Sequence, residues 1–282
     1  MDISTFYPQN DTLRNYIDYY YFLKADSPDF KTTYYAFPNT AVPLSIHRSI
    51  QYEIKEHATA VQATKDGKPG ALLQRSFQQP LLVNLQGPVD KVTICFNAAG
   101  MAPFISRPFS EIASVDSQAF SDWDTLPAYQ QLLQAFFSTD GHEERVKLLE
   151  TFLLSICHPQ AEHALISKAV AMLSDFEDQY SIENVAATLN LTTRSFNRLF
   201  HKHMSISPVA WKKIARFRHS LKNKLFNAQF KKLTEIGYDS NFYDQSYFIK
   251  VYNKLTGSNP GAFFKSIEKL ADDHLIFRFV KE

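Results

Sequence analysis

The feature that most constrains this chain is an internal repeat in its C-terminal half. One copy spans 185–208 and the other spans 236–260. Each copy has a small residue in a first apolar segment, then an asparagine followed by an apolar residue, then a longer segment with apolar residues at helical spacing. An aromatic residue stands eight positions before a proline in both copies: Phe200 and Pro208, Tyr252 and Pro260. Such self-similarity indicates one supersecondary unit used twice.

The first part of each copy has the features of a helix-turn-helix unit. A small residue, Ala186 in one copy and Gly237 in the other, lets two helices approach closely. Asn190 and Asn241 stand where the chain must turn, and asparagine tolerates the left-handed backbone region that such a turn needs. We therefore predict two helix-turn-helix units.

The second helix of each unit divides into a buried face and an outward face. The apolar set at helical spacing is Phe196, Leu199 and Phe200 in the first unit and Phe248, Val251 and Tyr252 in the second. The outward side chains suit base reading, because arginine can bond guanine, asparagine and glutamine can bond adenine, and an aliphatic group can contact the thymine methyl. The predicted base-contacting residues are Arg194, Asn197, Arg198, His201, Gln245, Ser246, Ile249 and Lys250.

A long helix with one apolar side is predicted between the two units. Ser207 can cap it, and Pro208 fits its first helical position. Its apolar side carries Trp211, Ile214, Phe217, Leu221 and Leu225, and its other side carries Lys212, Lys213, Arg216, Arg218, Lys222 and Lys224. Two reading helices on one rigid connector would enter major-groove segments about one turn, ~34 Å, apart.

The distribution of charge favours a polyanionic partner. The net charge is only +1, but 1–160 carries 12 basic and 17 acidic residues, whereas 161–282 carries 18 basic and 12 acidic ones. Within 191–265, fourteen cations stand against three acids. Lysines and arginines that neutralise phosphates release condensed counterions, so such a cluster is typical of nucleic-acid binding. The predicted phosphate-contacting residues are Thr193, Lys202, Lys212, Lys213, Lys222, Asn253 and Lys254.

The first ~120 residues predict short strands and turns. Apolar or alternating runs occupy 34–37, 42–47, 52–54, 81–85 and 92–96, and glycines and prolines separate them. Many short strands favour a barrel or sandwich. After Trp123 the periodicity becomes helical over 126–137 and 146–156, and the apolar faces of these helices need the sheet or another copy of the chain as a partner. The predicted fold class is α+β, with a β-rich N-terminal part and an all-α C-terminal part.

Residues 165–265 resemble the AraC/XylS-type DNA-binding domain, which has two helix-turn-helix motifs. The closest stretches are 233–238, 244–248, 251–254, Gly257 and Asn259-Pro260. The family usually has glycine at the positions of Asn190, Asn241 and Ser205, and often alanine at that of Gly237, which can loosen the helix by up to ~1 kcal/mol. The resemblance implies double-stranded DNA as ligand, RNA polymerase as partner, and activation of transcription.

The N-terminal motifs are similar to the cupin-like sensor domains of some regulators in that family. They include 19–22, 37–40, 86–88 and 94–96. The resemblance implies a barrel-like effector or dimerisation domain, with the helices of 125–157 as contact in a homodimer. The expected effector pocket contains Tyr35, Phe37, His47 and Phe96, although aromatic strand residues also fill cores. The predicted division is 1–120 sensor domain, 121–160 helical linker, 161–270 double helix-turn-helix domain and 271–282 C-terminal tail.

Two other functions remain open on the residues alone. A metal-dependent cupin-type enzyme would use His47, Glu53, Glu56 and His57, but no His-x-His pattern is present. A non-specific nucleic-acid-binding module would use the basic surface without reading bases. No catalytic residue, metal site or cofactor is predicted, because phosphate loops, nucleophile triads and metal motifs are absent.

The two cysteines, Cys95 and Cys157, form no Cys-x-x-Cys pattern, and no signal peptide or membrane anchor is recognisable. We therefore expect a cytoplasmic protein.

Overall fold

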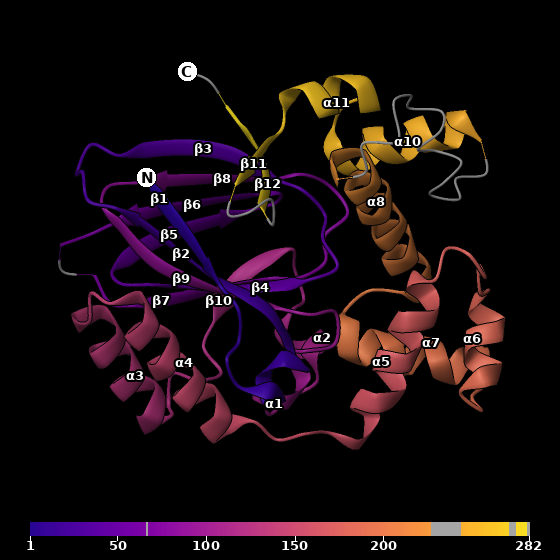
Figure 1. Ribbon diagram of the computed structural model, residues 1–282, viewed down its shortest axis with the longest axis horizontal. Helices are drawn as coiled ribbons and strands as arrows, with labels where there is room; N and C mark the ends of the chain where they lie inside the picture. The colour runs from indigo at the N-terminus through magenta and orange to yellow at the C-terminus, as the bar shows by residue number, and fades with distance from the viewer. Residues whose placement is uncertain (66, 227–243, 271–274, 281–282) are drawn as a thin grey trace.

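The computed structural model describes residues 1–65, 67–226, 244–270 and 275–280. Figure 1 shows a β-rich N-terminal part beside a group of C-terminal helices. The predicted α+β class is confirmed. The part of the second repeat that covers 236–241, with Gly237 and Asn241, lies outside the described residues, as do 233–235.

Twelve described strands form two six-stranded sheets. All neighbouring pairs are antiparallel except β6 and β8, which run parallel. In spatial order, the first sheet contains β1 (Asp2–Phe6), β2 (Ile17–Ala25), β9 (Val89–Phe96), β4 (Val42–His47), β7 (Gly70–Gln74) and β10 (Ser117–Phe120). The second contains β11 (Glu268–Leu270), β12 (Leu275–Phe279), β3 (Lys31–Ala36), β8 (Leu81–Gln86), β6 (Ala58–Ala63) and β5 (Ile50–Lys55).

The first sheet is buried on both faces, which explains why β2 is continuously apolar between Tyr19 and Leu23. Successive side chains of a strand point to opposite faces. Tyr20 and Phe22 therefore enter a core beneath the helices, whereas Tyr19 and Tyr21 enter a second core between the two sheets. A strand with one solvated face would have alternated apolar and polar residues instead.

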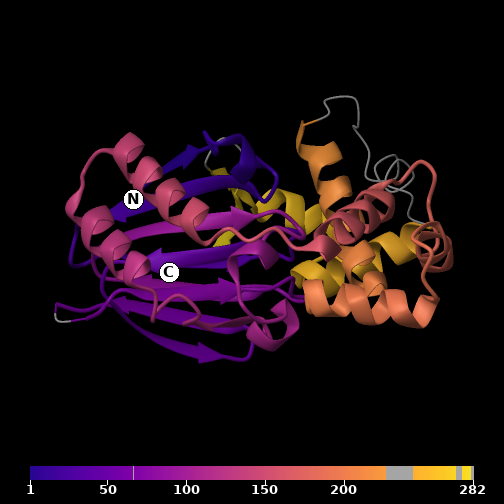
Figure 2. The same cartoon turned by 90° about the horizontal axis from the view of Figure 1, so that it is seen from below.

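Two helices cover the outer face of the first sheet (Figure 2). They are α3 (Pro127–Ser138) and α4 (His142–Ile156), close to the predicted ranges. Their apolar residues pack with those of the sheet in one core, so the sheet is the partner that their apolar faces required. The same core includes residues from three short elements: α1 (Asp11–Arg14), η1 (Ala102–Phe104) and α2 (Phe109–Ile112).

The described C-terminal helices form two cores, one for each repeat copy. The linker between α4 and these helices is tied to η1, because the backbone N–H of His158 donates to the carbonyl of Pro103 at 2.8 Å. The helices are α5 (Ala161–Ser174), α6 (Ile182–Thr188), α7 (Thr193–Met204), α8 (Pro208–Phe226), α10 (Gln245–Thr256) and α11 (Pro260–Ser266).

The end of the chain differs from the tail expected over 271–282. Residues 275–279 form β12, which pairs antiparallel with β3 and extends the second sheet. These residues form a strand because apolar side chains recur at every second position. Leu275 and Phe277 enter the core between the sheets, where the ring centroids of Phe277 and Tyr34 are 4.3 Å apart. The chain thus returns to the N-terminal part after the helices (Figure 1).

Candidate nucleic-acid interface and ligand cavity

Helix α7 is the second helix of the first helix-turn-helix unit. It begins after Thr192, whose hydroxyl accepts the backbone N–H of Ser195 at 3.1 Å and so caps the helix. Phe196 and Phe200 are completely buried in the core of this unit. The turn before α7 contains Asn190 at φ 55°, the left-handed conformation predicted for it. The local sequence therefore sets the direction of the helix and the face that it buries.

The outward face of α7 holds the residues predicted to contact bases in this unit. Arg194, Arg198 and His201 are exposed, and no ion pair of theirs occurs among the described residues. Asn197 is half-buried, and its amide donates to the carbonyl of Thr193 at 2.8 Å. The three exposed side chains are free to approach a ligand, whereas Asn197 would have to give up an internal hydrogen bond.

Helix α10 has the same construction. The carboxylate of Asp244 caps it by accepting the backbone N–H of Tyr247 at 2.7 Å. Its apolar residues Phe248, Val251 and Tyr252 are buried in the second helical core, as predicted. The other predicted residues of this helix, all exposed, are Gln245, Ser246, Ile249, Lys250, Asn253 and Lys254.

The residues predicted to contact phosphates divide into two groups. Thr193 and Lys222 are exposed and Lys213 is half-buried, with no ion pair among the described residues. Lys202 instead contacts the Glu162 carboxylate at 2.6 Å, and the ammonium of Lys212 donates to a backbone carbonyl. The Lys202 and His203 side chains hold the pKa of the Glu162 carboxyl below its usual value. A phosphate would therefore compete with internal partners at Lys202 and Lys212.

Helix α8 joins the two units and also contacts the N-terminal part through Arg218. This guanidinium donates from Nε to the carbonyl of Pro38 at 2.6 Å and from Nη2 to that of Phe37 at 2.9 Å. The Phe37 ring packs edge-on against Phe263 of α11, with centroids 4.8 Å apart. Arg218 therefore faces the sheets and not the basic side of the helix on which it was predicted.

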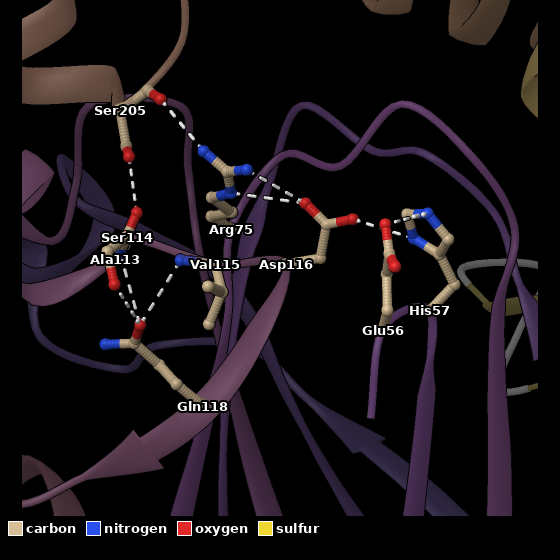
Figure 3. A network of polar contacts seen from close by, with 9 residues as sticks. All are labelled: Glu56, His57, Arg75, Ala113, Ser114, Val115, Asp116, Gln118 and Ser205. Atoms are coloured by element: carbon tan, nitrogen blue, oxygen red, sulfur yellow. Dashed lines mark hydrogen bonds and ion pairs between the residues drawn. The ribbon is translucent and has the colours of Figure 1, made fainter. Parts of the chain in front are cut away.

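The first unit has its own contact with the N-terminal part, at the C-terminal end of α7 (Figure 3). Arg75, after β7, contacts the Asp116 carboxylate through Nε and Nη2 and donates from Nη1 to the carbonyl of Ser205 at 3.2 Å. The hydroxyl of Ser205 donates to the carbonyl of Ala113. His57 contacts the other oxygen of Asp116 at 3.1 Å. This network ties one end of α7 to the sheet domain.

A cavity of about 70 Å³ lies between the two sheets, and Arg218 forms part of its wall. Of the residues expected in the effector pocket, Phe37 and His47 line it. Tyr35 and Phe96 are not among its lining residues: the Tyr35 ring lies beneath the Arg278 guanidinium, and Phe96 packs in the core under the helices. These two side chains point to the opposite face of their strands, because strand residues alternate.

The polar lining of the cavity is basic. Lys91 and His47 are each only 3% exposed. Burial lowers the pKa of Lys91 to about 8. Burial, and then the nearby Lys91 ammonium, hold the pKa of His47 well below its usual value, so its imidazole is neutral at pH 7. No aspartate or glutamate occurs among the described residues that line the cavity.

The residues considered for a metal-dependent enzyme are not gathered into a site. His57 contacts Asp116 and, at 3.6 Å, the exposed Glu56, whereas His47 lies in the cavity wall and Glu53 is exposed. Among the described residues, no group of three or more histidine, cysteine, aspartate or glutamate side chains could hold a metal ion. In the same part of the chain, no helix has the length and apolar character needed to cross a membrane.

Sequence reasoning missed the contacts and positions of three residues that the structure makes prominent: Arg218, Lys91 and Ser205. For Arg218 and Lys91, the sequence contains a pattern that could have predicted their buried positions. Arg218 falls four residues after Ile214 and three before Leu221, within the apolar stripe of its helix. Lys91 interrupts an apolar strand that is buried on both faces. The contact of Ser205 with Arg75 joins positions 130 residues apart and has no local signal.

Comparisons with known families give two separate matches, one in the N-terminal part and one in the C-terminal part of the chain. Residues 185–266 match a family described as "Helix-turn-helix domain", and residues 5–117 match a domain of unknown function (DUF6597). The first match includes both predicted recognition helices. It confirms the helix-turn-helix prediction for the C-terminal part.

Two curated relatives are arabinose operon regulatory proteins. That of Escherichia coli (strain K12) is 26% identical over 137 residues, which are 45% of this chain and 46% of the relative. That of Salmonella typhimurium (strain LT2) is 26% identical over 152 residues, which are 49% of this chain and 53% of the relative. The chain thus spans about half the length of the curated relatives it matches. These matches support the AraC/XylS resemblance.

Among solved structures, ToxT from Vibrio cholerae aligns with 94% of this chain and 98% of its own, at 11% sequence identity and a TM-score of 0.47.

Proposed function

We propose, on the premise that residues 185–266 form a helix-turn-helix domain of the AraC type, that this protein is a sequence-specific DNA-binding transcription regulator that responds to a small molecule. The observation that carries the proposal is the repeated construction of α7 and α10. Both helices bury aromatic residues inward, expose polar and cationic side chains outward, and are linked through one long helix.

The outward faces supply the chemistry of base reading. Arg194 and Arg198 on α7 can each donate a pair of hydrogen bonds to a guanine edge. On α10, Lys250 can bond guanine, Gln245 can bond adenine, and Ile249, which is 36% exposed, can contact a thymine methyl. Thr193, Lys213, Lys222, Asn253 and Lys254 are the side chains best placed to contact phosphates, since Lys202 and Lys212 have internal partners.

The effector would act through the N-terminal part, because this part contacts both reading units. The Arg75 network holds the C-terminal end of α7, and the Phe37 ring packs on the core that includes α10 and α11. Arg218 belongs to the connector and also lines the cavity. A ligand that moves Arg218 or Phe37 would change how the two reading helices are held relative to each other.

The partners follow from the same proposal. Double-stranded DNA is the ligand of the reading helices, and RNA polymerase is the partner that an activator would contact. A homodimer would use the outer side of α3 and α4, where Leu154 is 38% exposed although the opposite side of α4 is buried on the sheet. Two copies would then read two sites on one duplex.

The test is selection from a randomised duplex pool with the purified full-length chain at two salt concentrations. An enriched motif with two blocks about one helical turn apart is the expected result, because two helices on one connector read successive major-groove segments. Binding that weakens with salt and enriches no motif would leave only a basic surface and would overturn sequence-specific regulation. The variant with Arg198 and Lys250 both changed to Ala is the matched control, and it should enrich no motif.

A further inference from the structure

Lys91 is a buried cation with no anionic partner among the described residues. It is 3% exposed, and its ammonium has no hydrogen-bond or ion-pair partner among the described residues; its one recorded contact is with the Tyr21 ring, 5.3 Å from the centroid. An ammonium taken out of water without compensation costs free energy, and buried charges in proteins are normally paired. We propose that Lys91 and His47 bind the carboxylate group of a small organic acid inside the cavity between the sheets.

The positions of the two residues follow from strand register. His47 on β4 and Lys91 on β9 are directly paired across the first sheet, and both line the cavity. Thr93 and Ser45, the next inward pair, bond each other at 2.8 Å and so satisfy their hydroxyls. Neither the His47 ring nor the Lys91 ammonium has such a partner among the described residues. Two adjacent polar groups at one end of the cavity are therefore available to a ligand.

The charge of the lining selects an anion. The described lining residues include two cationic side chains, Lys91 and Arg218, and no acidic one. Arg218 is already bonded to the carbonyls of Phe37 and Pro38. The uncompensated charge therefore lies at Lys91, where an ammonium and an imidazole N–H could both donate to one carboxylate.

The remaining lining and the volume limit the rest of the ligand. Val61, Leu72, Val83 and Leu85 supply apolar walls beyond the polar end. The cavity volume of about 70 Å³ counts the space open to the centre of a water-sized sphere. One water molecule needs about 10 to 15 Å³ of such space, so the cavity has room for about five water molecules. A short aliphatic acid of comparable size fits this space, with its chain toward the apolar walls. Butanoate and pentanoate are suitable probes.

If the regulator function proposed above holds, this acid is the effector. The Lys91 end of the cavity is built entirely from the sheets, whereas Arg218 and Phe37, which also line it, belong to the contact with the helical domain. Occupancy would thus be communicated to the connector α8.

The experiment is thermal unfolding of the full-length chain with pentanoate and with pentanamide, its neutral counterpart, at millimolar concentration. Pentanoate should raise the Tm by about 2 °C or more, because a ligand that binds only the folded state stabilises it. Pentanamide should raise it by much less. Lys91→Met should abolish the pentanoate shift, and Lys31→Met, which removes an exposed ammonium from β3, should retain it. An equal Tm shift with pentanamide, no Tm shift with pentanoate, or an undiminished pentanoate shift in Lys91→Met would overturn the proposal.

The variant without ligand gives a second, independent readout. Methionine has a similar length and no charge, so Lys91→Met should raise the Tm of the empty chain if the ammonium is uncompensated. A lower Tm would show that the ammonium is structurally satisfied and would overturn the assignment. Sequence-specific DNA binding of the wild-type chain, measured separately, distinguishes the two proposals. Its absence would overturn the regulator function, whereas the Tm shifts test only the acid site.

The pH dependence sharpens this readout. The pKa of Lys91 is lowered to about 8 in the folded chain from the ordinary 10.5, so the unfolded chain binds more protons between these values and folding stability rises with pH there. The other titratable groups facing the cavity are His47, Tyr19, Tyr21, Tyr34, Cys95 and Arg218; burial lowers the pKa of His47 and Arg218 and raises that of the tyrosines and the thiol. The wild-type chain should gain Tm relative to Lys91→Met above pH 8, and a constant difference would contradict an uncompensated ammonium.

Discussion

From the N-cap of the second helix to the following proline, the two helix-turn-helix units correspond at a constant offset of 52 positions. Their N-caps Thr192 and Asp244 and their C-caps Ser205 and Gly257 are related in this way, as are Pro208 and Pro260. Both C-caps have left-handed backbones, with φ 56° at Ser205 and 69° at Gly257. The same offset relates Arg194 to Ser246 and Arg198 to Lys250. One local design therefore occurs twice, with different side chains on the reading face.

The units differ in how they are attached to the N-terminal part. The first is held by hydrogen bonds at its C-cap, where Ser205 bonds Ala113 and Arg75. The second is held by the packing of Phe37 in one core with Phe263, and also by hydrogen bonds of Arg278 in β12 to Ser258 and of Arg218 in α8 to Phe37 and Pro38. Hydrogen bonds fix direction over short distances, whereas apolar packing is non-directional. The two attachments should therefore respond differently to substitution.

The largest expected effect is on the packed attachment. Phe37→Ala removes a ring that is 2% exposed and should cost about 3 to 5 kcal/mol of stability in the second unit. Amide hydrogen exchange should become faster in α10 and α11 and change little in α7. Phe30→Ala, at a partly buried ring in the core between the sheets, is the matched control. Equal acceleration in α7 and α10 would show that the two attachments are not independent.

The next effect concerns the two reading faces. Arg198→Ala and Lys250→Ala are equivalent substitutions, and each should weaken binding to the selected site by about 1 to 3 kcal/mol. The loss should be larger for Arg198, because a guanidinium makes two directed bonds to guanine and an ammonium is a point charge. Titration of a labelled duplex by fluorescence anisotropy measures both. Wild-type affinity in both variants would show that the faces are assigned wrongly.

The next effect is expected at the two C-caps, where a substitution should change the free energy of unfolding by about 1 kcal/mol or less. Gly257→Ala forces a Cβ onto a left-handed residue and should cost about 1 kcal/mol, since the space itself is open. Ser205→Gly relieves that strain but loses the bond to Ala113, so we expect a near-zero net change, whereas Ser205→Ala loses only the bond and should cost about 1 kcal/mol. Chemical denaturation compares the three. A Ser205→Ala chain as stable as the wild type would show that the hydroxyl contributes nothing to the attachment.

The smallest effect is expected at the connector. Lys222→Ala removes an exposed cation and should weaken binding to all duplexes alike, lowering the salt dependence by about one counterion. Lys212→Ala is the matched comparison, and we expect a smaller change there because this ammonium already donates to the Tyr180 carbonyl. Binding isotherms over a salt series supply the slopes. A loss at Lys222 confined to the selected sequence would contradict a backbone contact.

Local patterns in the sequence were sufficient to predict the C-terminal elements. The cap of α8 at Ser207, whose hydroxyl accepts the backbone N–H of Ala210 at 3.2 Å, the left-handed turn at Asn190 and the buried aromatics of α7 and α10 all depend on residues within a few positions of each other. Helical spacing and capping chemistry act over that range, so one sequence reveals them. The α+β class and the short strands of the N-terminal part were predictable for the same reason. Whether the outward residues contact DNA stays a prediction.

Tertiary structure decided the contacts between distant segments. It placed β12 beside β3, Arg218 against Phe37 and Pro38, Ser205 against Arg75, and Lys91 beside His47 in a cavity whose described lining includes no acidic side chain. Each of these depends on which strand or helix lies next to another, and no local periodicity encodes that choice. The sequence by itself therefore determined two helices of matched construction, and only the packing of the whole chain decided how they are held together and where a cavity lies beside them.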